Sequence, residues 1–286
     1  MTTTQTIQPT QTPVTSIPIE RDEFCDPSYV DPNAKLPRIQ ALRGTTKAKC
    51  GYFIPIDQLA ASGWLDFNEK QLQTYTYEAS GHQEQGLLIG QPRMLVCPKS
   101  PVLGFDRTLS DETESLVVVG EYNREFKNDP NIGNTQYFQV VLLDELNQPL
   151  HITPFIYRAS GANHATFSQH WQQLCREVEA CHAIANQISG LQKDWRFRSL
   201  CVFCFTTGRE TARSTLTSKK SPACKVISHE VPKLESWKDY FVGFDRQRKD
   251  WIWSALQPSQ PLIVPSAETP LLSSNNEPST ARSQEG

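Results

Sequence analysis

Apolar and polar residues alternate through most of the middle of the chain, as they do in half-buried β-strands. Residues 72–79 place Tyr75 and Tyr77 on one side and threonines on the other. Further apolar runs, which we read as strands, follow at residues 87–89, 93–97, 115–119, 137–143, 150–153, 197–205 and 225–231. The turn at residues 144–149 is short enough to join the two runs that flank it into an antiparallel hairpin.

One long amphipathic helix is predicted at residues 166–188, where apolar side chains recur every three or four positions. Gly190 is suited to its C-terminal end. Shorter helices are predicted at residues 236–241 and 247–255. This order of elements predicts an α+β fold, with a mostly antiparallel curled sheet or small barrel, OB-like among the options. The long amphipathic helix packs on the sheet, and a short helix follows near the C-terminus.

The two ends of the chain have a different composition. Residues 1–33 and 257–286 contain ten of the twenty prolines, together with many Thr, Ser and Gln residues. Such segments bury too little apolar surface to offset the loss of chain entropy on folding. We therefore expect a disordered N-terminal tail at residues 1–33, a single α+β domain at 34–256 and a disordered C-terminal tail at 257–286.

The sequence predicts a cytoplasmic protein. Its N-terminus lacks the basic and apolar regions of a secretory signal. The longest apolar run, residues 200–205, is far shorter than the roughly 20 residues of a membrane-spanning helix. The eight cysteines are spread along the chain as buried small hydrophobic residues would be. We expect no membrane partner and no cofactor.

Several short motifs occur in a fixed order along residues 34–245. They are the segments at residues 36–40, 51–54, 78–81, 92–96, 151–155 and 160–162. In this order the chain resembles a family of uncharacterised cyanobacterial proteins that bears a domain-of-unknown-function label. The resemblance implies a bacterial cytoplasm, but no activity and no catalytic residues.

Two sets of residues could bind metal ions. Cys201, Cys204, Cys224 and His229 together supply three sulfurs and an imidazole, a set that zinc accepts. However, Cys201 and Cys204 lie three apart in a strand-like run, so they point to opposite faces, and buried structural cysteines are the simpler interpretation. The second set is an acid-x-Lys pattern of metal-dependent nucleases with two upstream acids, for which a solvated loop is the simpler interpretation. Its residues are Asp111, Glu121, Glu125 and Lys127.

The net charge of −3 conceals two segments of opposite sign. Residues 106–146 contain nine acidic and three basic residues, and residues 191–225 contain eight basic and two acidic residues. Both can be ordinary solvated faces, or the basic segment can bind a polyanion.

A polar loop is predicted at residues 206–222, between two strands. Basic loops beside aromatic side chains are typical of proteins that bind single-stranded DNA or RNA. The candidate phosphate-binding residues are Arg196, Arg198, Arg209, Arg213, Lys219 and Lys220, and the candidate stacking residues are Tyr75, Tyr77 and Phe197.

The leading hypothesis is thus a non-catalytic protein that binds single-stranded nucleic acid. The alternative is a protein-interaction or assembly module, including a homo-oligomer, that uses an exposed sheet edge and the acidic segment. A metal-dependent nuclease is the third hypothesis.

Overall fold

The structure, a computed structural model, describes residues 36–258 except 66–67, 78–80, 191 and 214–219. The strands of the described residues are β1 (Arg38–Leu42), β2 (Gly51–Pro55), β3 (Leu72–Thr76), β4 (Gln83–Ile89), β5 (Arg93–Pro98), β6 (Leu103–Asp106), β7 (Val117–Glu121), β8 (Ile132–Leu142), β9 (Phe155–Ser160), β10 (Val202–Arg213) and β11 (Lys220–His229). The α-helices are α1 (Ile56–Ser62), α2 (Arg107–Glu112), α3 (Gly161–Asn186), α4 (Trp195–Arg198) and α5 (Arg246–Leu256). Short 3-10 helices occupy Lys47–Lys49, Glu69–Gln71, Phe126–Asn128 and Trp237–Tyr240.

The strands form one curled sheet in the order β11-β10-β5-β8-β9-β1-β2-β4-β3, with β6 and β7 branching from β8. Every pair is antiparallel except β1 and β9, which run parallel with Arg38 opposite Ile156. The sheet is an open half-barrel. The prediction of an α+β fold with a curled, mostly antiparallel sheet, one long helix and a short C-terminal helix is confirmed.

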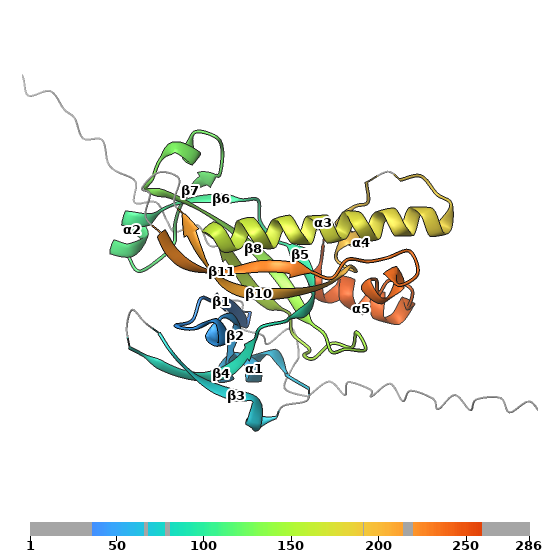
Figure 1. Cartoon of the computed structure of the whole chain (residues 1–286), viewed down its shortest axis with the longest axis horizontal. Helices are drawn as coiled ribbons and strands as arrows, with labels where there is room; N and C mark the ends of the chain where they lie inside the picture. The colour runs from blue at the N-terminus through green and yellow to red at the C-terminus, as the bar shows by residue number, and fades with distance from the viewer. Residues whose placement is uncertain (1–35, 66–67, 78–80, 191, 214–219, 259–286) are drawn as a thin grey trace, which may run out of the picture. The chain divides into compact units, whose positions relative to one another are not determined.

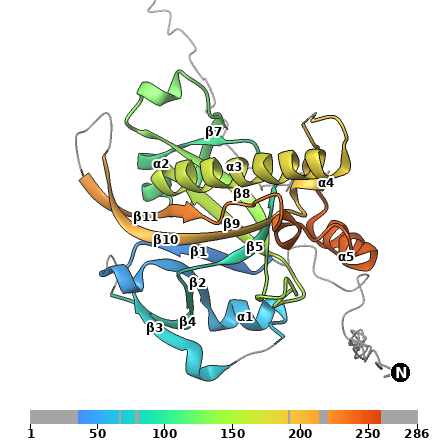
Figure 2. The same ribbon diagram turned by 45° about the vertical axis from the view of Figure 1, so that its right-hand side comes forward.

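The long helix α3 packs on β8, β9 and β11 and supplies the centre of the core. Phe167, which is fully buried, contacts the rings of Phe138, Tyr157 and Phe203 from three strands. Figures 1 and 2 show α3 on one side of the β10–β11 hairpin, and β1–β4 with α1 on the other. No helix of the described residues is both long and apolar enough to cross a membrane.

Three local predictions need correction. The predicted strand at residues 197–205 begins only at Val202, because the Asp194 side chain accepts a hydrogen bond from Phe197 N and caps helix α4. The predicted loop at residues 206–222 is largely strand, because β10 continues to Arg213 and β11 begins at Lys220. The threonines of this segment are β-branched and favour an extended backbone.

The third correction concerns the predicted strand at residues 150–153. Only isolated bridges form there, between Leu143 and Pro149 and between Trp64 and His151. The buried His151 ring turns inward, and its Nε2 accepts a hydrogen bond from Leu142 N at 2.8 Å. The side chain thereby takes the place of a ladder partner for β8.

Candidate nucleic-acid interface

The candidate residues of α4 have partners within the protein. Arg198 is 9% exposed, and its Nε donates to Glu179 Oε1 at 2.7 Å. Arg196 is exposed and forms an ion pair with Asp194 at 3.0 Å. The Phe197 ring stacks on that of Phe241, with 4.6 Å between centroids. Arg198 and Phe197 thereby fasten α4 to α3 and to Phe241, whereas Arg196 pairs with the residue that caps its own helix.

Arg209 lies in the second half of β10. It is seven positions beyond Val202, which corresponds to about 23 Å of extended chain. Its Nε donates to the carbonyl of Gly44 at 2.9 Å. Arg213 and Lys220 are register partners in the backbone ladder at the ends of β10 and β11, whereas Lys219 lies outside the described residues. Among the cations whose side chains the structure describes, Arg196 and Arg198 therefore lie in α4 and Arg209 lies away from them along β10.

The two tyrosines of the predicted strand also differ. Tyr75 is 7% exposed and packs against Phe53, so it presents no free ring face to a base. Tyr77 is half-buried and lines a groove over β1 and β9 that also reaches Asn163 in the first turn of α3. Of the candidate stacking residues, Tyr77 alone borders this groove within the described part of the chain.

The floor of this groove is the polar face of β8, β9 and β1. Because side chains alternate along a strand, Tyr157 points to the core while Arg158 points to the groove. Tyr137 of β8 lies opposite Arg158 in the ladder, and Arg38 of β1 lies opposite Ile156. The last four of these five residues, but not Tyr157, line a cavity of about 750 Å³, which we call the β1–β9 groove.

The walls of the β1–β9 groove come from α1 and the β3–β4 hairpin. Asp57 and Gln58 of α1 line one wall, and Tyr77, His82 and Glu84 of the hairpin line the other. A second cavity of about 350 Å³ adjoins it, sharing Tyr77 and Asn163 and adding the exposed Arg43. The hollowed surface thus continues along the β1–β2 connection, where the Gly44 carbonyl binds Arg209.

The ring of Tyr77 is held in place by hydrogen bonds. Its hydroxyl donates to Glu84 Oε2 at 2.6 Å and accepts from Gln40 Nε2 at 2.9 Å. Burial raises the pKa of Tyr77 above its ordinary value, and the Glu84 carboxylate raises it further. The His82 ring stacks on Tyr77, with 6.1 Å between centroids. Tyr77 therefore remains a neutral, oriented aromatic surface.

The exposed guanidinium groups of Arg38 and Arg158 have no carboxylate partner in the part of the chain that the structure describes. Neither forms an ion pair with a carboxylate of the described residues, although Asp57 and Glu84 stand on the opposite walls. The carboxylate of Asp57 accepts a hydrogen bond from Gln58 Nε2 at 2.7 Å, and that of Glu84 is bound by Tyr77. The two cations are consequently available to a ligand.

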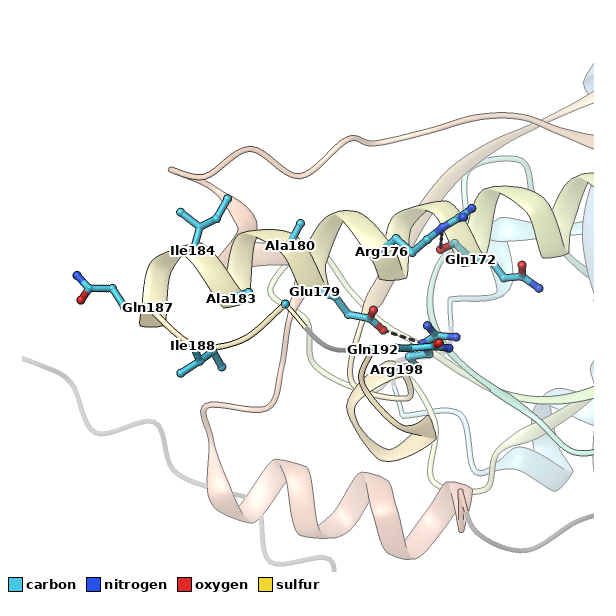
Figure 3. Close-up of a pocket in the computed structure, with 11 residues that line it drawn as sticks. Gln172, Arg176, Glu179, Ala180, Ala183, Ile184, Gln187, Ile188, Gln192 and Arg198 are labelled. Atoms are coloured by element: carbon cyan, nitrogen blue, oxygen red, sulfur yellow. Dashed lines mark hydrogen bonds and ion pairs between the residues drawn. The ribbon is translucent and has the colours of Figure 1, made fainter.

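Another cavity, of about 840 Å³, lies beside the C-terminal half of α3. In Figure 3 Glu179 reaches toward Arg198 across it, and Ala180, Ala183 and Ile184 lie along the helix beside them. Glu179 neutralises the charge of the buried Arg198. This cavity therefore attracts a polyanion much less strongly than the β1–β9 groove does.

The four candidate zinc ligands do not converge. Cys201 is hydrogen-bonded to Cys175, Cys204 accepts from Arg93 Nη1 at 2.9 Å, and Cys224 is hydrogen-bonded to Cys50. His229 lies between His170, 2.8 Å from its Nδ1, and Glu177, 3.2 Å from its Nε2. Within the described ranges no three His, Cys, Asp or Glu side chains are placed to hold a metal ion. This applies equally to the exposed acids of the candidate nuclease site.

Comparison with protein families identifies the chain. A family model described as a domain of unknown function, DUF5895, matches residues 33–273. The chain belongs to this family. No curated protein matches the chain, and no solved structure matches it.

The sequence hypothesis missed Arg38 and Arg158, the two groove arginines of this DUF5895 protein. A local signal for both was present. Each arginine follows the alternation of a short apolar strand, as in Arg38-Ile39-Gln40 and Ile156-Tyr157-Arg158. A charge at such a position must point away from the core. The pairing of β1 with β9, which brings the two arginines together, is a tertiary feature that this local pattern does not predict.

Proposed function

We propose that this protein binds single-stranded nucleic acid in the β1–β9 groove. One observation carries the proposal: Arg38 and Arg158, two exposed arginines without a carboxylate partner among the described residues, line the same groove as Tyr77 and Tyr137. Arginine attracts phosphates, and aromatic rings stack on unpaired bases. Of the residues in the sequence hypothesis, the proposed site keeps Tyr77. Arg38 and Arg158 take the place of the lysines and arginines of the basic segment as phosphate-binding residues.

The electrostatics of the walls suggest how a strand would lie. Asp57 and Glu84 repel phosphates, whereas the amide of Gln58 can bind the edge of a base. The phosphates would therefore follow Arg158 and Arg38 along the floor, toward Arg43 in the adjoining cavity. The bases would face Tyr77 and His82. A duplex cannot bind in this way, because its bases are stacked inside.

Fluorescence anisotropy with labelled single strands, measured from 50 to 300 mM salt, tests the proposal. For two to four phosphate contacts, we expect log K to fall against log salt with a slope of roughly −1.4 to −3. A duplex of equal length should bind more weakly. The absence of binding at the lowest salt, or equal affinity for the duplex, would contradict the proposal.

Assembly through a sheet edge is the second candidate function. Within the described residues, β10 is the one strand partner of β11, and β11 exposes Ile227 at 43%. On the other edge of β11, Thr166 and Asn163 of α3 hydrogen-bond to Val226 N and the Cys224 carbonyl, so a strand from another molecule can pair only with the remainder of that edge. Light scattering coupled to gel filtration measures this directly. A strictly monomeric mass at high protein concentration would exclude self-assembly.

A further inference from the structure

Two cysteines far apart in the sequence meet beside the β1–β9 groove. Cys50 ends the connection between β1 and β2, and Cys224 lies in β11 opposite Arg209 of β10. Their thiols are hydrogen-bonded to each other. Each residue is 4% exposed. The curl of the sheet thereby brings together thiols that lie 174 positions apart (224 − 50).

The surroundings hold this contact and differentiate the two thiols. Arg209 binds the Gly44 carbonyl of the same β1–β2 connection, and Asn163 Nδ2 donates to the Cys224 carbonyl at 3.1 Å. The hydrogen bond from Cys224 lowers the pKa of the Cys50 thiol; burial opposes this effect, and the charge of Arg209 adds to it. That hydrogen bond and burial raise the pKa of Cys224. Cys50 is therefore the stronger thiolate donor of the pair.

Small molecules have a route to the pair. Cys224 lines the 350 Å³ cavity that adjoins the β1–β9 groove, together with Arg43 and Tyr77. This cavity is wide enough for an oxidant of a few atoms, because one water occupies only about 30 Å³ of liquid. A hydroperoxide can approach Cys224 there without unfolding of the sheet, and Cys50, which does not line the cavity, is the neighbour of Cys224.

We propose that Cys50 and Cys224 are a redox-active pair that a hydroperoxide converts to a reversible disulfide. The Cys50 thiolate attacks the terminal peroxide oxygen, so an S–O bond forms, the O–O bond breaks, and the leaving alkoxide takes a proton to become an alcohol. The Cys224 thiolate then attacks the resulting sulfenic acid, and hydroxide leaves as water with the proton that Cys224 has lost. Two thiols and one hydroperoxide thus give one disulfide, one alcohol and one water.

A second thiol pair in the same chain provides the comparison. Cys175 of α3 and Cys201 before β10 are also hydrogen-bonded, but both are 0% exposed. Burial raises the pKa of Cys201, and its hydrogen bond to Cys175 raises it further. Both pairs thus have two neighbouring thiols. The Cys50–Cys224 pair differs from the other because the pKa of one thiol, Cys50, is lowered and because a cavity adjoins the pair. We expect Cys175 and Cys201 to stay reduced.

Differential alkylation and peptide mass spectrometry on the full-length, reduced protein test this proposal. With one equivalent of hydrogen peroxide, the expected product is an intramolecular Cys50–Cys224 cross-link that dithiothreitol reverses. Cys224→Ser should instead accumulate a sulfenic acid at Cys50, which dimedone traps. Cys50→Ser should leave Cys224 as a thiol, and Cys175→Ala should give the wild-type cross-link.

Several results would overturn the proposal. One is oxidation of Cys181, which is more exposed than Cys50 and Cys224, while those two stay reduced. The second is a cross-link between Cys175 and Cys201 in place of the Cys50–Cys224 cross-link. The third is a cross-link between different molecules. The wild-type measurement decides among these even if a variant fails to fold. It uses no oligonucleotide, so its outcome is independent of the proposed nucleic-acid binding.

Discussion

The chain places arginines in two settings that differ in what surrounds them. At α4, Arg198 and Arg196 are each joined to a carboxylate, Glu179 at 2.7 Å and Asp194 at 3.0 Å. In the β1–β9 groove, Arg38 and Arg158 are exposed and share their cavity with tyrosines. The basic segment of the sequence contains the first two arginines and neither of the second two.

This difference shows that local charge density is a poor guide to an anion site. A cation near a carboxylate of the same fold has its field largely cancelled, and moving it to a ligand requires breaking the existing pair. The isolated arginines Arg38 and Arg158 retain their field because alternation along the strands directs them away from the core. Four substitutions test this contrast, in order of the expected change in free energy.

Removing the carboxylate partner of Arg198 should have the largest effect. Glu179→Ala leaves a buried guanidinium unpaired, which we expect to lower the free energy of unfolding by about 3–5 kcal/mol in urea titrations. The double variant Glu179→Leu with Arg198→Met should recover most of this loss, because the unpaired charge is gone. Equal destabilisation in both variants would mean that packing, not charge, holds α4 in place.

Removing both groove arginines should have the next largest effect, on binding. Charge-assisted contacts contribute about 1.5 kcal/mol each, so Arg38→Gln with Arg158→Gln should weaken oligonucleotide binding roughly 100-fold. The salt slope should fall by about 1.4. Anisotropy titrations measure both quantities. The matched control, Arg196→Gln, should bind as wild type does, and an equal loss in this control would remove the contrast.

Replacing the groove tyrosine should have a moderate effect. Tyr77→Leu removes a stacking surface worth about 1–3 kcal/mol per base, so we expect an affinity roughly tenfold lower and an unchanged salt slope. The same titration separates this result from that of the arginine variants. A change in slope without a loss of affinity would contradict the stacking role of Tyr77.

Neutralising Asp194 should have the smallest effect. Asp194→Asn keeps the oxygen that caps α4 and removes the ion pair with Arg196, which is exposed and worth less than about 1 kcal/mol. We expect little change in melting temperature and a gain of less than twofold in oligonucleotide affinity. A gain in affinity as large as the loss expected from removing Arg38 and Arg158 would show that Arg196 binds phosphate equally well once its carboxylate partner is removed.

The sequence predicts those parts of the fold that depend on local periodicity. The long helix is found within a few residues of its predicted bounds, and most of the strands are where alternation places them. Predictions failed where a single side chain decides the outcome, as the Asp194 cap does at α4 and the buried His151 ring does after β8. Hydrophobic periodicity does not report such contacts, although an aspartate at a helix start is itself a local signal for a cap.

The candidate site was less predictable than the fold. Tyr77 was identified because alternation places it on a strand face, but Tyr75, on the same face, is covered by Phe53. Arg38 and Arg158 come together only because β1 pairs in parallel with β9, and no local pattern reports which strands become neighbours. The site therefore follows from topology, whereas the hypothesis relied on composition.

The parallel pairing of β1 with β9 also affects how the chain folds as it is synthesised. β1 waits for a neighbour until β9 is made more than 110 positions later (Arg38 to Ile156). At ~5–20 residues per second, this delay is on the order of 6–24 s at the ribosome. During that time β1 can pair only with β2, and the opposite edge of β1 is open to other nascent chains. A long contact order of this kind predicts slow folding that benefits from chaperones.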